Sequence, residues 1–173
     1  MRLVFTKSVL PLSVLIRGVL REPVSHFAIV FEPDLLLFQS NLLGTNLQYF
    51  PRFADHAEVV YSISIPLSQG VEDKIYMAAM EKYAGQGYGY KELIYFTWRA
   101  FLFSYFKRPW PKKNIMDESN DYLCVGLAQA LDCDGMPRWV REAVSAVSDL
   151  EMTTPYALFQ ILTFAMSESK KNG

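Results

Sequence analysis

Apolar and polar residues alternate most clearly in segment 58–65, which predicts a β-strand that Pro66 ends. Two more strands are predicted at residues 25–31 and 35–39. The link between them, Glu32-Pro-Asp34, is short and signals a hairpin. Residues 2–5 favour an edge strand. Together these segments predict a small antiparallel sheet in the first part of the chain.

Helical spacing of apolar residues dominates the segments outside the strands. It predicts helices over residues 10–20, 68–84, 121–132, 138–147 and 154–166. Pro11 and Pro155 fall in the first turns of their helices, where proline is tolerated. We therefore expect an α+β fold with one domain, residues 1–166, and a tail, residues 167–173, that frays.

Residues 93–106 form the most apolar run, interrupted only by Arg99. A membrane-spanning helix needs roughly twenty apolar residues, so this run is too short to span a bilayer. It favours a core helix or a helix packed against a partner. A basic cluster from Lys107 to Lys113 follows and leaves a second interpretation open, a helix lying at a membrane surface.

The composition narrows the possible partners. The chain has 173 residues, a formal net charge of −1 and no basic stripe, so nucleic acid is not expected as a partner. No signal peptide is recognisable, and the two cysteines, Cys124 and Cys133, lie too far apart on one predicted helix for easy bridging. We expect reduced thiols and a cytoplasmic or virion-associated protein.

Cys124 and His26 are the residues most suited to chemistry. Cys124 lies in the first turn of the predicted helix 121–132, where the helix N-terminus favours a thiolate. His26 lies on a predicted buried strand and could accept the thiol proton. Each residue also has a plain structural interpretation: a small buried hydrophobe for Cys124 and a core histidine for His26.

The supporting polar groups are less clear. Gln39, on the strand after His26, could reach across the hairpin and orient the imidazole, although an amide carries no charge to stabilise an imidazolium. His56 lies in a polar segment and is expected to be exposed. Asp117, Glu118 and Asp121 form an acidic loop that is expected to be solvated. We predict no metal and no cofactor, since no cysteine pair or phosphate-binding loop is present.

Several short motifs together resemble the permuted NlpC-like, papain-fold superfamily of cysteine peptidases and amidases, in its small phage- and prophage-encoded branch. The opening residues 2–17 are similar to the start of such proteins. Ser25-His26-Phe-Ala-Ile-Val30 matches the histidine strand, Gly87-Tyr-Gly-Tyr90 a conserved turn, and Thr154-Pro155 the start of the last helix. Papain-like enzymes normally place the cysteine before the histidine, so the reversed order here fits the permuted form.

The resemblance implies specific roles for these residues. Cys124 would be the nucleophile and His26 the base, on a sheet packed against a helix led by Cys124, while Tyr90 and Tyr122 would line the substrate groove. Two departures weaken the pattern. Val125-Gly126 follows the cysteine where the family usually has Ser-Glu, and Gln39 replaces a common acidic residue.

Two functions remain open from the sequence. The first is a cysteine hydrolase that cleaves a peptidoglycan stem peptide or another acyl-amide substrate through Cys124, His26 and Gln39. The second is a virion or tail component in which the same fold packs into a phage particle, using the segment from Leu93 to Lys113 as the contact surface. A membrane partner is the least expected.

Overall fold

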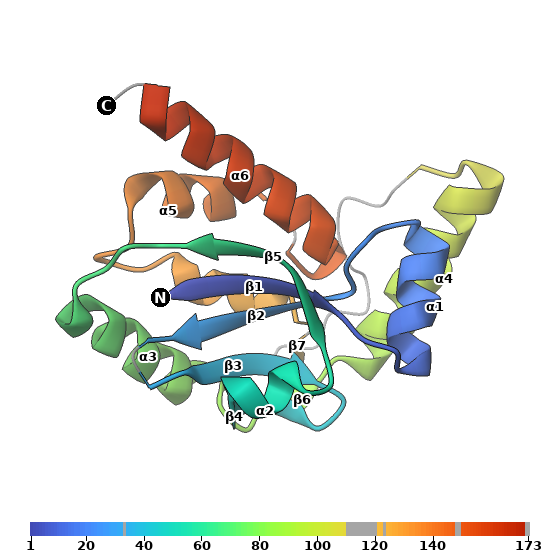
Figure 1. Ribbon diagram of the computed structural model, residues 1–173. Helices are drawn as coiled ribbons and strands as arrows, with labels where there is room; N and C mark the ends of the chain where they lie inside the picture. The colour runs from blue at the N-terminus through green and yellow to red at the C-terminus, as the bar shows by residue number, and fades with distance from the viewer. Residues whose placement is uncertain (33, 110–120, 123, 148–149, 172–173) are drawn as a thin grey trace.

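The computed structural model describes residues 1–32, 34–109, 121–122, 124–147 and 150–171 (Figure 1). Five strands form one antiparallel sheet with the order β4-β3-β2-β1-β5. The strands are β1 (Arg2–Lys7), β2 (His26–Phe31), β3 (Leu36–Asn41), β4 (Gly44–Tyr49) and β5 (Glu58–Ser64). The helices and the sheet confirm the predicted α+β class.

Strand β1 is an interior strand of the sheet, between β2 and β5, so the prediction of an edge strand is wrong. It pairs with β2 on one side and β5 on the other. Leu3, Val4 and Phe5 have no exposed surface, because successive side chains enter the cores on both faces. The run Leu-Val-Phe is therefore that of a strand buried on both sides.

The helices largely follow the predicted segments. They are α1 (Pro11–Leu20), α2 (Phe50–Ala54), α3 (Gln69–Tyr83), α4 (Tyr90–Phe106), α5 (Arg138–Ser145) and α6 (Pro155–Lys171), with short 3₁₀ helices η1 (Gly126–Leu131) and η2 (Leu150–Met152). A two-residue parallel ladder joins β6 (Gly87–Tyr88) to β7 (Asp121–Tyr122). Helix α6 runs past the expected end at Met166, so most of the tail expected to fray is helical.

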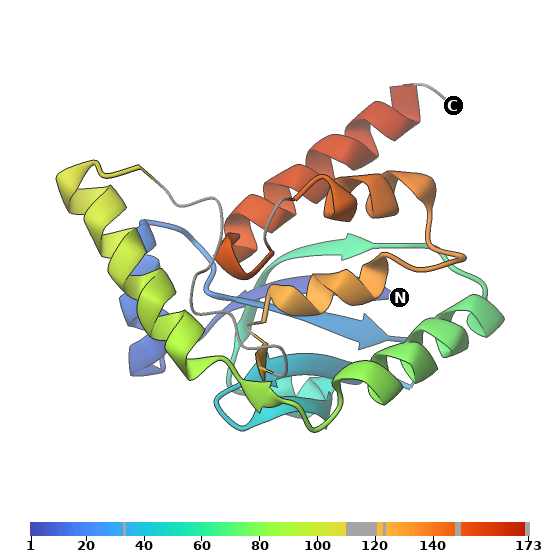
Figure 2. The ribbon, with the colours of Figure 1, turned by 180° about the vertical axis from the view of Figure 1, so that it is seen from behind.

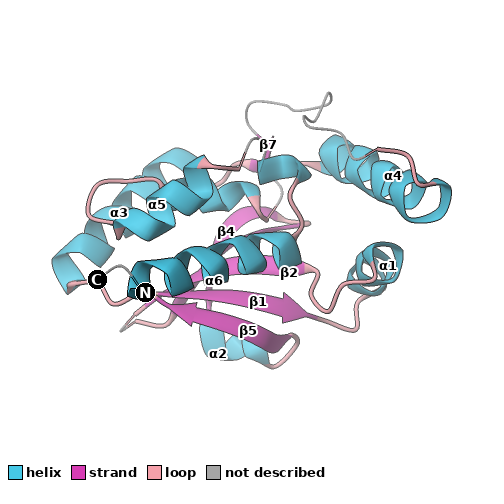
Figure 3. Cartoon of the chain, turned by 90° about the horizontal axis from the view of Figure 1, so that it is seen from above, coloured by secondary structure: helices cyan, strands magenta, loops and turns pink. Residues whose placement is uncertain are grey.

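The two faces of the sheet are covered by different numbers of helices. Figure 3 shows α3, α5 and α6 on one face and α2 on the other. The main core lies on the first face, and a small cluster around Val4, Ala28, Val30 and Leu37 lies under α2. Helices α1 and α4 pack together beyond one end of the sheet (Figure 1), at the end where β1 finishes and β2 begins.

Helix α4 contains 17 residues and exposes several large apolar side chains. Its last residue is Phe106, and the following Lys107 adopts a left-handed conformation. Among the described residues, no helix combines the length and the hydropathy that crossing a bilayer requires. Of the basic cluster that follows α4, residues 110–113 lie outside the described part of the chain.

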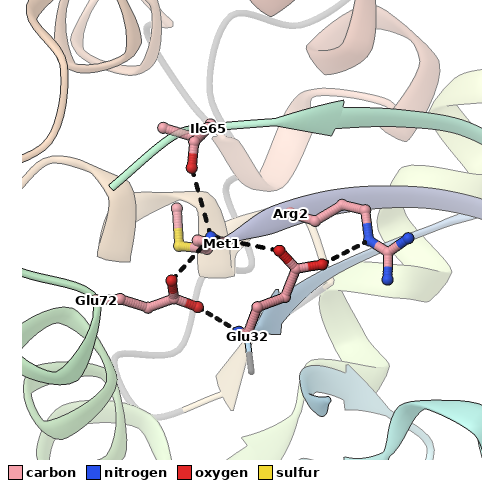
Figure 4. Close-up of polar contacts among 5 residues, drawn as sticks. All are labelled: Met1, Arg2, Glu32, Ile65 and Glu72. Carbon is pink, nitrogen blue, oxygen red and sulfur yellow. Dashed lines mark hydrogen bonds and ion pairs between the residues drawn. The ribbon is translucent and has the colours of Figure 1, made fainter. Parts of the chain in front are cut away.

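A buried polar contact closes the opposite end of the sheet (Figure 4). The amino group of Met1 donates to Glu72 Oε2 at 2.9 Å and to the carbonyl oxygen of Ile65 at 3.4 Å. Glu72 Oε1 accepts the backbone N–H of Glu32. The side chain of Glu72 is 7% exposed, so this carboxylate joins β1, β2 and α3 away from water.

Gly44 is a position where only glycine fits. Its φ is +94°, and a Cβ there would lie 2.6 Å from the carbonyl oxygen of Gln86. That oxygen accepts the N–H of Thr45 at 2.9 Å, which ties the β3–β4 hairpin to the segment before β6. We expect Gly44→Ala to lower the free energy of unfolding by about 2 kcal/mol, from the left-handed backbone and the clash together.

Urea unfolding would measure this loss, with Gly18→Ala as the matched control. Gly18 lies in α1, its φ is not positive, and no atom comes within 4 Å of the place that a Cβ would take. The same substitution there should be neutral or stabilising by up to ~1 kcal/mol. A loss at Gly18 equal to that at Gly44 would show that the close approach to Gln86 is unimportant.

Candidate active site

A cavity of about 580 Å³ lies between the end of the sheet and the helices α1 and α4. Its wall includes three residues singled out from the sequence, His26, Gln39 and Cys124. His26 is the first residue of β2, Gln39 lies on β3, and Cys124 lies in a turn before η1. Residues from three separate parts of the chain therefore meet around one space.

The imidazole of His26 is held by a hydrogen bond across the hairpin. Its Nε2 lies 3.0 Å from Gln39 Oε1, which confirms the predicted contact. Gln39 Nε2 in turn donates to Gln48 Oε1 at 3.0 Å. This arrangement assigns the amide oxygen of Gln39 to the ring, so Nε2 carries the hydrogen and Nδ1 is left as the acceptor.

Burial keeps His26 neutral. Removal from water lowers the pKa of His26 to about 4, and the hydrogen bond to Gln39 raises it only in part. No Asp, Glu, Lys or Arg side chain is among the described residues that line the cavity. With no carboxylate to stabilise an imidazolium, His26 is a neutral acceptor at physiological pH.

Cys124 does not lead an α-helix, so that prediction is wrong. Asp121 and Tyr122 pair with β6 instead, and the following helix is a six-residue 3₁₀ segment that starts at Gly126. Because the ladder holds the first residues of the expected helix in an extended conformation, the helical segment begins only at Gly126 and is short. The buried Cys124 lies in the turn between the two elements.

The segment after Cys124 packs against the sheet on the face opposite to His26. Figure 2 shows η1 between α3 and α5, on the face of the sheet that these helices cover. His26 shares its strand face with Ala28 and Val30, which is the face covered by α2, and its ring lies 6.1 Å from that of Phe53. His26 and Cys124 reach the same cavity because His26 is at the very end of its strand.

Neither of the two tyrosines predicted to line the substrate groove is among the described residues of the cavity wall. Tyr90 is the first residue of α4, is 52% exposed, donates its hydroxyl to the Leu42 carbonyl, and is not part of the cavity wall. Tyr88, two residues earlier, lines the cavity instead. Tyr122 lies on β7 opposite Tyr88, and its side chain is outside what the structure describes.

Several polar residues of the wall were not predicted from the sequence. Ser13 and Ser25 lie with their hydroxyl oxygens 2.6 Å apart, and Ser13 Oγ also accepts the N–H of Ser8. Gln48 supports Gln39 because the tight β3–β4 hairpin brings both onto one face. The only signal for this pairing was the period of two in β4. His56 lies at the cavity and is exposed, as expected.

The two cysteines differ in their surroundings, and neither forms a disulfide. Burial and the nearby carboxylates of Asp132 and Asp134 raise the pKa of Cys133. Cys133 is not among the cavity residues. It therefore provides an internal reference thiol for reactivity measurements on Cys124.

Within the described part of the chain, no group of three histidine, cysteine or acidic side chains is arranged to hold a metal ion. Asp117 and Glu118 of the predicted acidic loop lie outside the described residues.

Comparison of the chain with protein-family models, with curated proteins and with solved structures gives no match.

Proposed function

We propose that the chain is a cysteine hydrolase that cleaves an acyl ester or amide, with Cys124 as the nucleophile, His26 as the base and Gln39 as the residue that orients His26. The observation that supports this most is the shared cavity of Cys124 and His26. The hydrogen bond between Nε2 and Gln39 leaves Nδ1 of His26 as the acceptor for a thiol proton.

The proposed reaction has two stages. His26 takes the thiol proton while the sulfur of Cys124 forms a bond to the acyl carbon, and the leaving group departs with the proton from His26. Water then attacks the thioester with His26 again as the base, which releases a carboxylic acid and restores the thiol. A neutral base with a pKa of about 4 makes this a slow enzyme unless substrate binding changes the site.

The order of the elements supports a permuted papain-like fold within this proposal. A histidine strand comes first, its hairpin partner carries the polar residue that bonds the imidazole, and the cysteine follows much later in the chain. The 3₁₀ helix after Cys124 and the position of His26 on the α2 face are departures from the pattern expected for that fold.

Alkylation by iodoacetamide at pH 7 tests the proposed pairing. Mass spectrometry of peptides would give the rate at Cys124 relative to Cys133 in the same molecule. We expect His26→Ala to lower the relative rate at Cys124 by about tenfold or more, because the thiol loses its proton acceptor. The matched control is His56→Ala, which removes the exposed histidine at the same cavity and should change the rate little.

An unchanged rate in His26→Ala would refute the hydrolase proposal. It would favour a second candidate function, an assembly component that packs against a neighbour in a larger particle such as a phage virion. The observation that favours this candidate is the apolar surface of α4, where Ile94, Trp98, Phe103, Tyr105 and Phe106 are 49–70% exposed. Such a surface is typical of a protein contact.

A further inference from the structure

The cavity wall is apolar over most of its lining. Helices α1 and α4 contribute Leu12, Ile16, Leu93 and Phe96, and the opposite wall includes Phe53 and Val125. These side chains come from four separate segments, and all of them face the space that Cys124 and His26 share. A substrate bound at Cys124 must therefore place part of its structure against hydrocarbon.

Several polar groups in the wall are already hydrogen-bonded within the protein. Ser13 and Ser25 are bonded together at 2.6 Å, and the amide of Gln39 is bonded to both His26 and Gln48. A peptide brings one amide N–H and one carbonyl per residue into the site, and each costs free energy if it is buried without a partner. This wall offers few partners for a peptide backbone.

The wall is also uncharged. No acidic or basic side chain other than the two histidines is among the described lining residues, and burial keeps His26 neutral. A substrate with carboxylates or ammonium groups, such as a peptidoglycan stem peptide, would lose hydration without gaining an ion pair. A hydrocarbon chain loses nothing of this kind and gains from leaving water.

We infer that the cavity binds the hydrocarbon chain of an acyl ester or amide, with the acyl carbon at Cys124. The inference rests on the proposed hydrolase function and names its substrate class: a fatty acyl compound in place of a peptide. The cavity, at about 580 Å³, is within the range of roughly 300–1,000 Å³ that is usual for sites burying a small molecule.

Alkylation with matched reagents tests the inference without requiring turnover. In each, the thiol proton of Cys124 passes to His26, the sulfur forms a bond to the iodoacetamide methylene carbon, and the carbon–iodine bond breaks so that iodide leaves. The reagents are iodoacetamide, N-hexyl iodoacetamide, and the same hexyl reagent with a terminal carboxylate in place of its methyl group. We expect the hexyl reagent to react at least about tenfold faster than iodoacetamide at Cys124, relative to Cys133.

The carboxylate reagent should lose most of that advantage, because the wall has no cation to pair with it. Faster reaction of the carboxylate reagent, equal rates for all three, or no reaction at Cys124 would each overturn the inference. The His26→Ala experiment decides the hydrolase proposal separately. A rate at Cys124 that depends on His26 but not on the hexyl chain would leave a hydrolase for another substrate.

Two identical substitutions on α1 locate the bound chain. Leu12→Glu places a carboxylate in the cavity wall, whereas Leu15→Glu places it on the same helix at a side chain that is 51% exposed and outside the wall. We expect Leu12→Glu to lower the hexyl-to-iodoacetamide rate ratio at least about fivefold. Leu15→Glu should leave the ratio unchanged, and an equal drop in both variants would contradict the assigned wall.

Discussion

Replacing Glu72 by glutamine is expected to lower the free energy of unfolding by about 3 kcal/mol. Both oxygens of this buried carboxylate are used, one by the amino group of Met1 at 2.9 Å and the other by the backbone N–H of Glu32. Glutamine keeps the size of the side chain but removes its charge, so the buried amino group would lose its nearest anion and keep only the more distant, half-exposed carboxylate of Glu32. Urea unfolding followed by circular dichroism would measure the loss.

Glu32→Gln is the matched control for this prediction. Its carboxylate is 45% exposed and lies 4.0 Å from the amino group of Met1 and 3.6 Å from Arg2 Nε. Exposed pairs of this kind contribute at most about 1 kcal/mol. Equal losses in the two variants would show that burial of Glu72 has no special effect. A purification tag should follow Gly173, so that Met1 keeps its amino group.

The contact of Glu72 illustrates what the sequence could not predict. Glu72 lies in the first turn of α3, where an acidic side chain favours the helix N-terminus. Its partner is 71 positions away, and nothing local in the sequence relates the two. Pairings of this kind depend on how the sheet and helices assemble. A pattern of neighbouring residues carries no information about that assembly.

Local patterns predicted the parts of the fold that depend on near neighbours. The hairpin from β2 to β3 was expected because a short link separates two β-rich runs, and the bond between His26 and Gln39 follows from that hairpin. Most helices were predicted for the same reason. The interior position of β1 in the sheet was not, since it depends on pairing with the distant β5.

Sequence reasoning identified residues of the candidate site better than it predicted their arrangement. His26, Gln39 and Cys124 do line one cavity, although their catalytic roles stay predictions. The helix expected at Cys124 is absent because Asp121 and Tyr122 pair with β6, a parallel contact that no periodicity signals. The resemblance pointed to Tyr90 as a groove residue, whereas Tyr88, two residues earlier, lines the cavity.

The wall chemistry gives a physical reason for an amide beside His26. A carboxylate at this position would stabilise an imidazolium, whereas the amide of Gln39 orients the ring without a charge. In a cavity lined largely by apolar side chains, a neutral Gln39–His26 pair avoids burying a carboxylate. An amide at this position is therefore consistent with a hydrocarbon ligand.

The pKa of His26 predicts a loss of stability in mild acid. Burial lowers this pKa from the ordinary 6.5 to about 4. Above pH 6.5 the group is neutral in both states and contributes nothing. Between pH 6.5 and 4 the unfolded chain binds a proton that the folded chain does not, so the free energy of unfolding falls as the pH falls. The loss reaches roughly 3 kcal/mol near pH 4, since one pKa unit is worth about 1.36 kcal/mol.

The difference in unfolding free energy between the native chain and His26→Gln isolates this effect, because carboxylates elsewhere titrate alike in both. Urea unfolding from pH 7.5 to pH 4 should show the native chain losing more stability than the variant, with most of the extra loss below pH 6. His56→Gln, which removes the exposed histidine, should follow the native chain. A constant difference between the native chain and His26→Gln across this range would mean that the pKa of His26 is the same in the folded and unfolded states. The cavity would then have to stabilise an imidazolium, and the neutral wall provides no group that does so.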